Sequence, residues 1–258
     1  MLMIRREQMQ GLAGKASPEF VEFMTAHLRK SFPAPASLWS PEDIHELVQQ
    51  GATTARTYGF ETGRQLCLYI DLSVELGIGF DTDVQLPWAA EILSDPGIST
   101  ADRRMDRLFD AATRYLDAVA GKDQVFAVRP LQKMIHYPVA QLDSRLERGV
   151  VQGVLGEFRE IWPQKYRRVT PERLSRLIEQ GMPQAASYGF TERKTLGGYL
   201  IFMYMLGHHF DRDPQYPWAP ACLGDPEVQT PTERFDRLHS AAMAALSKAT
   251  ERGDLPEE

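Results

Sequence analysis

The sequence has 258 residues, of which 43% are hydrophobic and 25% are charged. This composition is close to the globular average and excludes a disordered, collagen-like or coiled-coil chain. The 29 Lys and Arg residues against 35 Asp and Glu residues give a net charge of -6, so neither nucleic acid nor an anionic membrane surface is an expected partner.

Two features of the sequence indicate the cellular compartment, namely the cysteines and the N-terminus. Cys67 and Cys222 are too few for a disulfide framework, and each lies in an apolar stretch. Charged residues follow directly after Met1–Ile4, so the apolar region of a signal peptide does not form. We therefore expect a cytoplasmic protein with reduced thiols.

In chain order, the first half of the sequence predicts four main helices. The first covers about residues 18–30, and the second begins at Ser40-Pro41, an N-cap residue followed by proline, and ends at Gly59. The third, about 62–76, is apolar on most of its surface, which predicts a central position. The fourth begins with a capping box at Ser99-x-x-Asp102.

The stretch 121–141 interrupts this pattern. It contains Gly121, Pro130 and Pro138 and shows no helical periodicity, which is typical of a connection between domains. We place the boundary near residue 138, which divides the chain into modules 1–138 and 139–258.

The two modules share their sequence. When the chain is shifted by 130 residues, residues 33–112 align with 163–242 without a gap, and 31 of the 80 positions are identical. Chance would give only a handful of identities. A repeat of this length indicates an internal duplication of a whole module rather than a short-repeat solenoid.

The second half repeats the helix signals of the first. A helix over about 142–161 is followed by an N-cap at Thr170-Pro171, a terminating Gly189, an apolar helix over 191–206 and a capping box at Thr230 and Glu233. No segment alternates clearly enough to predict a strand. The expected fold is all-α, with two homologous helical-bundle modules.

A Phe-Asp-x-Asp motif occurs once in each module and is the first candidate for chemistry. Two carboxylates two residues apart could hold a divalent cation, although neither loop has the further ligands of an EF-hand. The alternative is that the carboxylates accept backbone N–H bonds while the phenylalanines anchor the loop in the core. The motif residues are Phe80, Asp81 and Asp83 in the first module and Phe210, Asp211 and Asp213 in the second.

The Pro-Trp-Ala runs present a similar choice. Trp88 and Trp218 could stack on a ligand, but their equal placement in both modules favours a packing role.

Other catalytic or metal-binding patterns are weak. His208 and His209 are adjacent, so on a helix they point in different directions and do not form a chelating pair. Asp71 and Glu75 share a helix face and could divide acid and base roles, although pairing with Arg103, Arg104 or Arg107 is the simpler interpretation. The sequence indicates no catalytic residue, metal site or cofactor.

The third helix of each module differs between the copies. Polar residues of the first copy are replaced by apolar ones in the second, which extends an apolar, Met-rich and aromatic face. Such a face suits a partner protein, a contact between modules or a homodimer, or a thicker core. The candidate partner-binding residues are Ile201, Met203, Tyr204, Met205, His208 and His209.

Five runs of the sequence belong together: Met3–Met9, Ala26–Pro33, Tyr58-Gly59, Phe80–Asp83 and Leu86–Leu93. They resemble a little-characterised family of helical bacterial proteins encoded beside spike and toxin genes of type VI secretion systems. The resemblance covers the first module to about residue 118 and is weaker in the second, which lacks the opening run and has Pro220-Ala221-Cys222 in place of Ala90-Glu91-Ile92.

The resemblance implies an accessory role around a secreted toxin and brings no catalytic residues with it. The first hypothesis is a non-enzymatic adaptor or chaperone that binds an effector or a spike component in the cytoplasm. An immunity protein that binds and neutralises a toxin is the second hypothesis, because an acidic surface suits a basic toxin. A metal-dependent enzyme that uses the Phe-Asp-x-Asp loops is the third.

Overall fold

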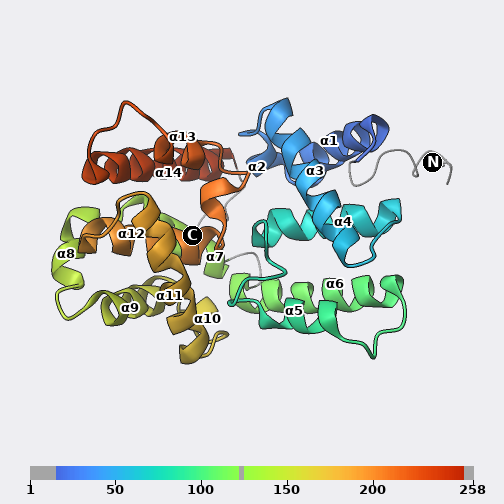
Figure 1. Ribbon diagram of the computed structural model, residues 1–258, viewed down its shortest axis with the longest axis horizontal. Helices are drawn as coiled ribbons and strands as arrows, with labels where there is room; N and C mark the ends of the chain where they lie inside the picture. Colours follow the sequence, from blue (N-terminus) through green and yellow to red (C-terminus); the bar gives the residue numbers. More distant parts are fainter. Residues whose placement is uncertain (1–15, 122–124, 253–258) are drawn as a thin grey trace.

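The computed structural model describes residues 16–121 and 125–252. Over these residues the chain forms fourteen α-helices and two short 3-10 helices, and it contains no strand (Figure 1). The predicted all-α fold is confirmed. None of the described helices is both long enough and apolar enough to cross a membrane. The N-terminal residues Met1–Met9, which the predictions about secretion and family used, lie outside the described residues.

The first half of the chain contains the first six helices. They are α1 (Pro18–Ser31), α2 (Pro33–Ala36), α3 (Pro41–Thr57), α4 (Gly63–Leu76), α5 (Pro87–Ser94) and α6 (Ala101–Ala120).

The second half begins after a connecting segment and repeats the same order of helices. The connection contains α7 (Val125–Ile135), η3 (Val139–Gln141) and α8 (Leu142–Arg145). The repeated helices are α9 (Val150–Ile161), α10 (Pro163–Tyr166), α11 (Pro171–Ser187), α12 (Arg193–Leu206), η4 (Phe210–Arg212), α13 (Trp218–Leu223) and α14 (Pro231–Arg252). Helices α10, α11 and α12 begin and end 130 residues after α2, α3 and α4. The origin of this order in a duplication stays a prediction.

Local sequence signals explain most helix ends. Ser40 caps α3 with a hydrogen bond from the backbone N of Asp43, and Thr170 caps α11 in the same way. The glycines that end these helices have positive φ angles of 78° at Gly59 and 83° at Gly189, which other residues adopt only with strain. The prediction for α6 was one residue too early, because Thr100 and not Ser99 is its N-cap.

The connecting segment is more helical than the sequence indicated. Helix α7 includes Pro130, and it forms because it packs against α6, α9 and α14. The predicted helix over 142–161 is divided by Gly149, whose φ is 116°. Met134 of α7 belongs to the second core, so that core includes residues before the predicted boundary at residue 138.

Each half has its own hydrophobic core. One cluster of buried side chains extends from Ala16 to Ala112, and a second extends from Met134 to Ala242. Helix α4 lies in the middle of the first half and α12 in the middle of the second (Figure 1). The predicted central positions of these two helices agree with this arrangement.

The halves lie side by side and are related by an approximate half-turn in the plane of Figure 1. Helices α5 and α6 lie at the lower right, and their counterparts α13 and α14 lie at the upper left. The contacts between halves follow the same relation, because α6 packs against α10 and α14 packs against α2. Helix α7 contacts both α6 and α14 and so bridges the halves.

Candidate functional site

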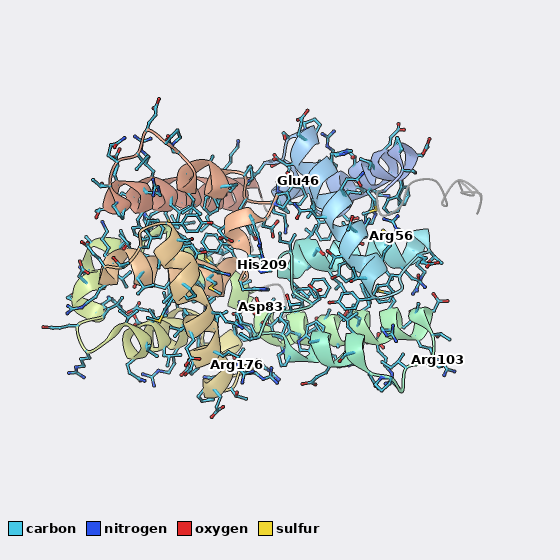
Figure 2. The ribbon with its side chains drawn as sticks, in the orientation of Figure 1. Glu46, Arg56, Asp83, Arg103, Arg176 and His209 are labelled. Carbon is cyan, nitrogen blue, oxygen red and sulfur yellow. The ribbon has the colours of Figure 1, made fainter. Side chains whose placement is uncertain are left out.

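The Phe-Asp-x-Asp loops lie at the contact between the halves, and Figure 2 shows Asp83 at this central position. Asp83 accepts a hydrogen bond from the backbone N of His208 at 3.2 Å, and Asp213 accepts one from the backbone N of Ile78 at 2.9 Å. Each carboxylate also accepts the backbone N–H of the glutamine two residues along, at 2.8 Å and 2.9 Å. The bonds within each loop are those that the backbone-accepting interpretation predicts. The bonds to His208 and Ile78 in addition join the two halves, one in each direction.

The two buried aspartates differ in their charge environment. Burial disfavours the charge of Asp83, but His208, the backbone N–H of Gln85 and Lys165 together hold its pKa below the ordinary value. Asp213 faces no comparable cation, and burial raises its pKa to about 6 despite its three hydrogen bonds. The pKa values at these equivalent positions of the two halves are thus shifted in opposite directions.

The first aspartate of each motif binds tyrosine hydroxyls. Tyr58 donates to Asp81 at 2.5 Å, whereas Asp211 accepts from both Tyr188, at 2.9 Å, and Tyr199, at 3.0 Å. Burial is the main reason that the pKa of each of these three tyrosines is raised, and the neighbouring carboxylate adds to it. The hydroxyls therefore stay protonated donors at neutral pH.

The aromatic residues of both motifs have packing roles. Phe80 and Phe210 are buried in the two cores, as the anchoring interpretation predicts. Trp88 is half-buried, with its ring centroid 6.0 Å from that of Tyr115. Trp218 is half-buried against the second core.

The predicted partner-binding face is not an exposed surface. Ile201, Met203 and Tyr204 are buried, because α12 is surrounded by α8, α9, α11 and α14. The apolar face of α12 is therefore core, which was one of the alternatives. Met205 is half-buried in the second core and lines a cleft between the halves.

His208 and His209 lie at the contact with the first half, where both rings approach Gly79. Their ring centroids are 3.7 Å apart, and Nδ1 of His208 lies 3.2 Å from the Asp83 carboxylate. Burial, His208 and Arg212 lower the pKa of His209 to about 3, so its ring is neutral in the folded protein. The pair serves the contact between halves.

A cleft of about 540 Å³ opens between the two halves, beside the packing of α6 on α10. This volume lies within the range of ligand-binding pockets, roughly 300–1,000 Å³. Residues of α4, α6, α7, α10 and α12 form its walls. The apolar lining includes Leu76, Leu116, Phe126, Trp162 and Met205, and the polar lining includes Glu75, Asp117, Gln164 and Lys165.

Among the described residues that line this cleft, Lys165 is the cation. Its ammonium donates to the backbone carbonyl of Tyr204 and lies 4.5 Å from the centroid of that ring. Burial lowers the pKa of Lys165 to about 8, and the opposing attraction of Asp83 keeps it from falling further. At neutral pH the described lining of the cleft therefore contains one positive charge among several carboxylates.

Asp71 and Glu75 do not pair with the arginines of α6. Arg104 donates to the backbone carbonyls of Tyr58 and Ile98, and Arg107 lies 3.8 Å from the carboxylate of Asp95, so the predicted pairing with these two arginines is wrong. The partner of Asp71 is His27 of α1, whose Nε2 lies 2.9 Å from Oδ1 and 3.0 Å from Oδ2.

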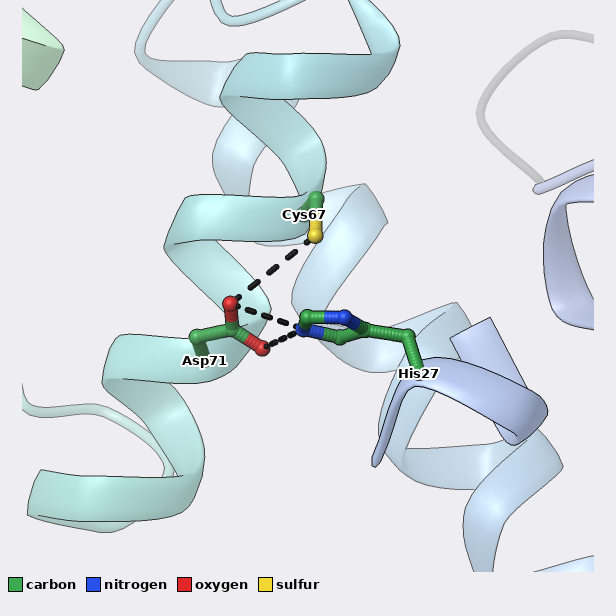
Figure 3. A group of neighbouring side chains, drawn as sticks. All are labelled: His27, Cys67 and Asp71. Carbon is green, nitrogen blue, oxygen red and sulfur yellow. Dashed lines mark hydrogen bonds and ion pairs between the residues drawn. The ribbon is translucent and has the colours of Figure 1, made fainter. Parts of the chain in front are cut away.

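Cys67 completes a cluster with this pair, shown in Figure 3. Its Sγ lies 3.8 Å from Oδ2 of Asp71, and the three possible ligand atoms lie within 4.8 Å of one another. Burial raises the pKa of Cys67 to about 12, and Asp71 adds to this effect, so the thiol is protonated. The sequence search for a metal cluster missed this site, because His27 is 44 residues from Asp71.

No model of a protein family, no curated protein and no solved structure matches this chain. The resemblance drawn from its sequence motifs therefore stays a prediction.

Proposed function

We propose that this chain is a non-enzymatic binding protein that holds a segment of a partner protein in the cleft between its two halves. The observation that supports the proposal is the cleft itself, because both halves contribute its walls and its apolar lining is interrupted by a few charged groups. This mixture is typical of sites that gain affinity from apolar contacts and orientation from a few polar groups.

The state of the Phe-Asp-x-Asp loops also favours binding over catalysis. Asp83 and Asp213 are buried and accept backbone N–H groups of the opposite half. Asp81 and Asp211 accept tyrosine hydroxyls. Carboxylates that are engaged in this way stabilise loops and are poorly placed to bind a catalytic metal.

The partner we propose is a secreted effector or a spike component of a type VI secretion system, bound in the cytoplasm by an adaptor or chaperone. The resemblance of the motifs to proteins encoded in such loci supports this choice. Glu75 and Asp117 in the cleft and the net charge of -6 favour a segment with apolar side chains and basic groups.

The test is co-expression of the chain with the product of each neighbouring gene, followed by affinity purification and an assay of any toxin in the complex. Asp117→Arg reverses a charge on an exposed side chain that lines the cleft. Asp110→Arg makes the same change one heptad earlier on α6, outside the cleft lining, and is the matched control.

We expect a complex with an active toxin or a spike protein, which Asp117→Arg weakens at least tenfold and Asp110→Arg leaves intact. A complex in which the toxin is inactive would replace the adaptor by an immunity protein. Equal binding by the two variants would contradict the assignment of the cleft.

A further inference from the structure

The cluster of His27, Cys67 and Asp71 lies outside the cleft lining and is not part of either Phe-Asp-x-Asp loop. We propose that these three side chains bind one zinc ion, through Nε2, Sγ and a carboxylate oxygen, with the fourth position open to water. The motivating observation is that three different ligand types from α1 and α4 have their donor atoms within 4.8 Å of one another (Figure 3).

The distances suit a tetrahedral ion after small movements. Zinc binds histidine nitrogen and carboxylate oxygen at about 2.0–2.2 Å and cysteine sulfur at about 2.3 Å, which places neighbouring ligand atoms about 3.3–3.7 Å apart. The separations here are 2.9 Å between His27 and Asp71 and 3.8 Å between Cys67 and Asp71. The third pair, His27 and Cys67, lies within 4.8 Å. Side-chain rotations that even out these three separations would place the donors at tetrahedral spacing.

The donor set selects the metal. Calcium and magnesium prefer oxygen ligands, whereas imidazole and thiolate together favour zinc among the common divalent ions. Three protein ligands with an open position are also the usual arrangement where zinc stays accessible. The side chains of His27 and Asp71 retain 27% and 18% of their exposure, which leaves a route from solvent.

The ligands are held in place before any ion binds. Cys67 and Asp71 are one helical turn apart on α4, so their side chains lie on one face. The ring of His27 stacks on Phe23 at 6.2 Å between centroids, with 10° between the planes. Ordered ligands lose little conformational freedom when they bind, which favours affinity.

The second half shows that the fold does not need this cluster. The positions 130 residues later are Glu157, Gly197 and Ile201, which do not form a comparable set of donors. Leu146 of the connecting segment occupies the space that a side chain at Gly197 would need. In the second half Glu157 is bonded to Tyr137 and Arg145 instead, so among the described residues the His-Cys-Asp cluster occurs in the first half alone.

The binding step balances in charge and protons. The thiol of Cys67 gives its proton to solvent, and the thiolate forms the sulfur bond to zinc. Before the ion binds, Nε2–H of His27 donates to the Asp71 carboxylate. On binding, Nε2 gives this proton to solvent and the ring carries its proton on Nδ1, so that the Nε2 lone pair faces the ion. One dipositive ion with one thiolate and one carboxylate gives a neutral centre.

The experiment uses the full chain without an affinity tag, treated with a chelator and then titrated with zinc chloride in a calorimeter. Cobalt(II) replaces zinc in a parallel titration, because a tetrahedral cobalt thiolate site shows intense visible absorption and a sulfur-to-cobalt charge-transfer band. The variants are Cys67→Ala and Asp71→Asn, and Cys222→Ala removes the other half-buried thiol as the matched control. Circular dichroism in chelator verifies the fold of each variant.

We expect one zinc per chain, with affinity reduced at least tenfold in Cys67→Ala and Asp71→Asn and unchanged in Cys222→Ala. The charge-transfer band should disappear only in Cys67→Ala among the two cysteine variants. If Cys67→Ala fails to fold, loss of binding in folded Asp71→Asn supports the site instead. Absence of zinc binding by the native chain, or equal binding by folded Cys67→Ala, would overturn the proposal.

Discussion

The two central aspartates provide a matched pair of substitutions, Asp83→Asn and Asp213→Asn. In both cases the asparagine keeps one acceptor oxygen and presents an NH2 group where the aspartate accepted N–H groups with both oxygens. One buried N–H of each site then faces a donor, which costs about 1–3 kcal/mol of the free energy of unfolding. This cost should be similar at the two positions because their hydrogen bonds correspond.

The charge term separates the two variants. A rise of the Asp213 pKa from 3.8 to about 6 means that its ionised form costs the folded state about 3 kcal/mol at neutral pH, since each unit is worth about 1.4 kcal/mol. Asp213→Asn removes this cost, so its stability should stay within about 2 kcal/mol of the native chain. Asp83→Asn brings no such gain, because the pKa of Asp83 is lowered in the folded protein, so it should lose at least the hydrogen-bond cost of about 1–3 kcal/mol.

The raised pKa of Asp213 also makes the stability of the protein depend on pH. Because the folded-state pKa of Asp213 is raised, its contribution to stability is complete below about pH 4 and is lost as the pH rises towards 6. Asparagine does not titrate, so the stability of Asp213→Asn relative to the native chain should improve by about 3 kcal/mol between about pH 4 and pH 7.5.

Urea unfolding followed by circular dichroism at both pH values measures these differences. Equal losses by the two variants at pH 7.5, or an Asp213→Asn difference that does not change with pH, would refute the reasoning.

Two further pairs of variants test the packing. Gly77 has a φ of 88°, and an added Cβ would lie 2.8 Å from a backbone carbonyl oxygen of the other half, so Gly77→Ala should lose about 2–4 kcal/mol in urea unfolding. Gly156→Ala, in the open middle of α9, should instead gain about 0.5–1 kcal/mol, and a similar loss by both would contradict the clash. Tyr58→Phe removes the hydroxyl that donates to the buried carboxylate of Asp81 and should lower the free energy of unfolding by about 1–2 kcal/mol. Tyr188→Phe should lose less, because Tyr199 still donates to the same carboxylate, and the reverse order would count against these hydrogen bonds.

Local features of the fold could be predicted because their signals are short. The caps at Ser40 and Thr170 and the glycines at 59 and 189 depend on one or two residues each, and the structure places them as expected. Helix α7 was missed because Gly121, Pro130 and Pro138 and the lack of helical periodicity predict a connection, whereas packing against both halves stabilises the helix.

The candidate sites could not be predicted from the sequence, because they depend on which residues are neighbours in three dimensions. An apolar helix face has the same sequence pattern whether a partner or the core covers it. For this reason Ile201 and Met203, which are buried in the core, were predicted as partner-binding residues. The spacing of Cys67 and Asp71 was visible in the sequence, but the placement of His27 beside them was not. The cleft is formed by segments of both halves, and no local pattern encodes it.

The most direct test of the proposed function is hydrogen–deuterium exchange of the chain alone and in complex with its co-purified partner. We expect the partner to slow exchange in three walls of the cleft, which are the C-terminal end of α6, α7 and α10. Slowed exchange confined to α1, α3 or α13, with the cleft walls unchanged, would show that the partner binds elsewhere and would contradict the account.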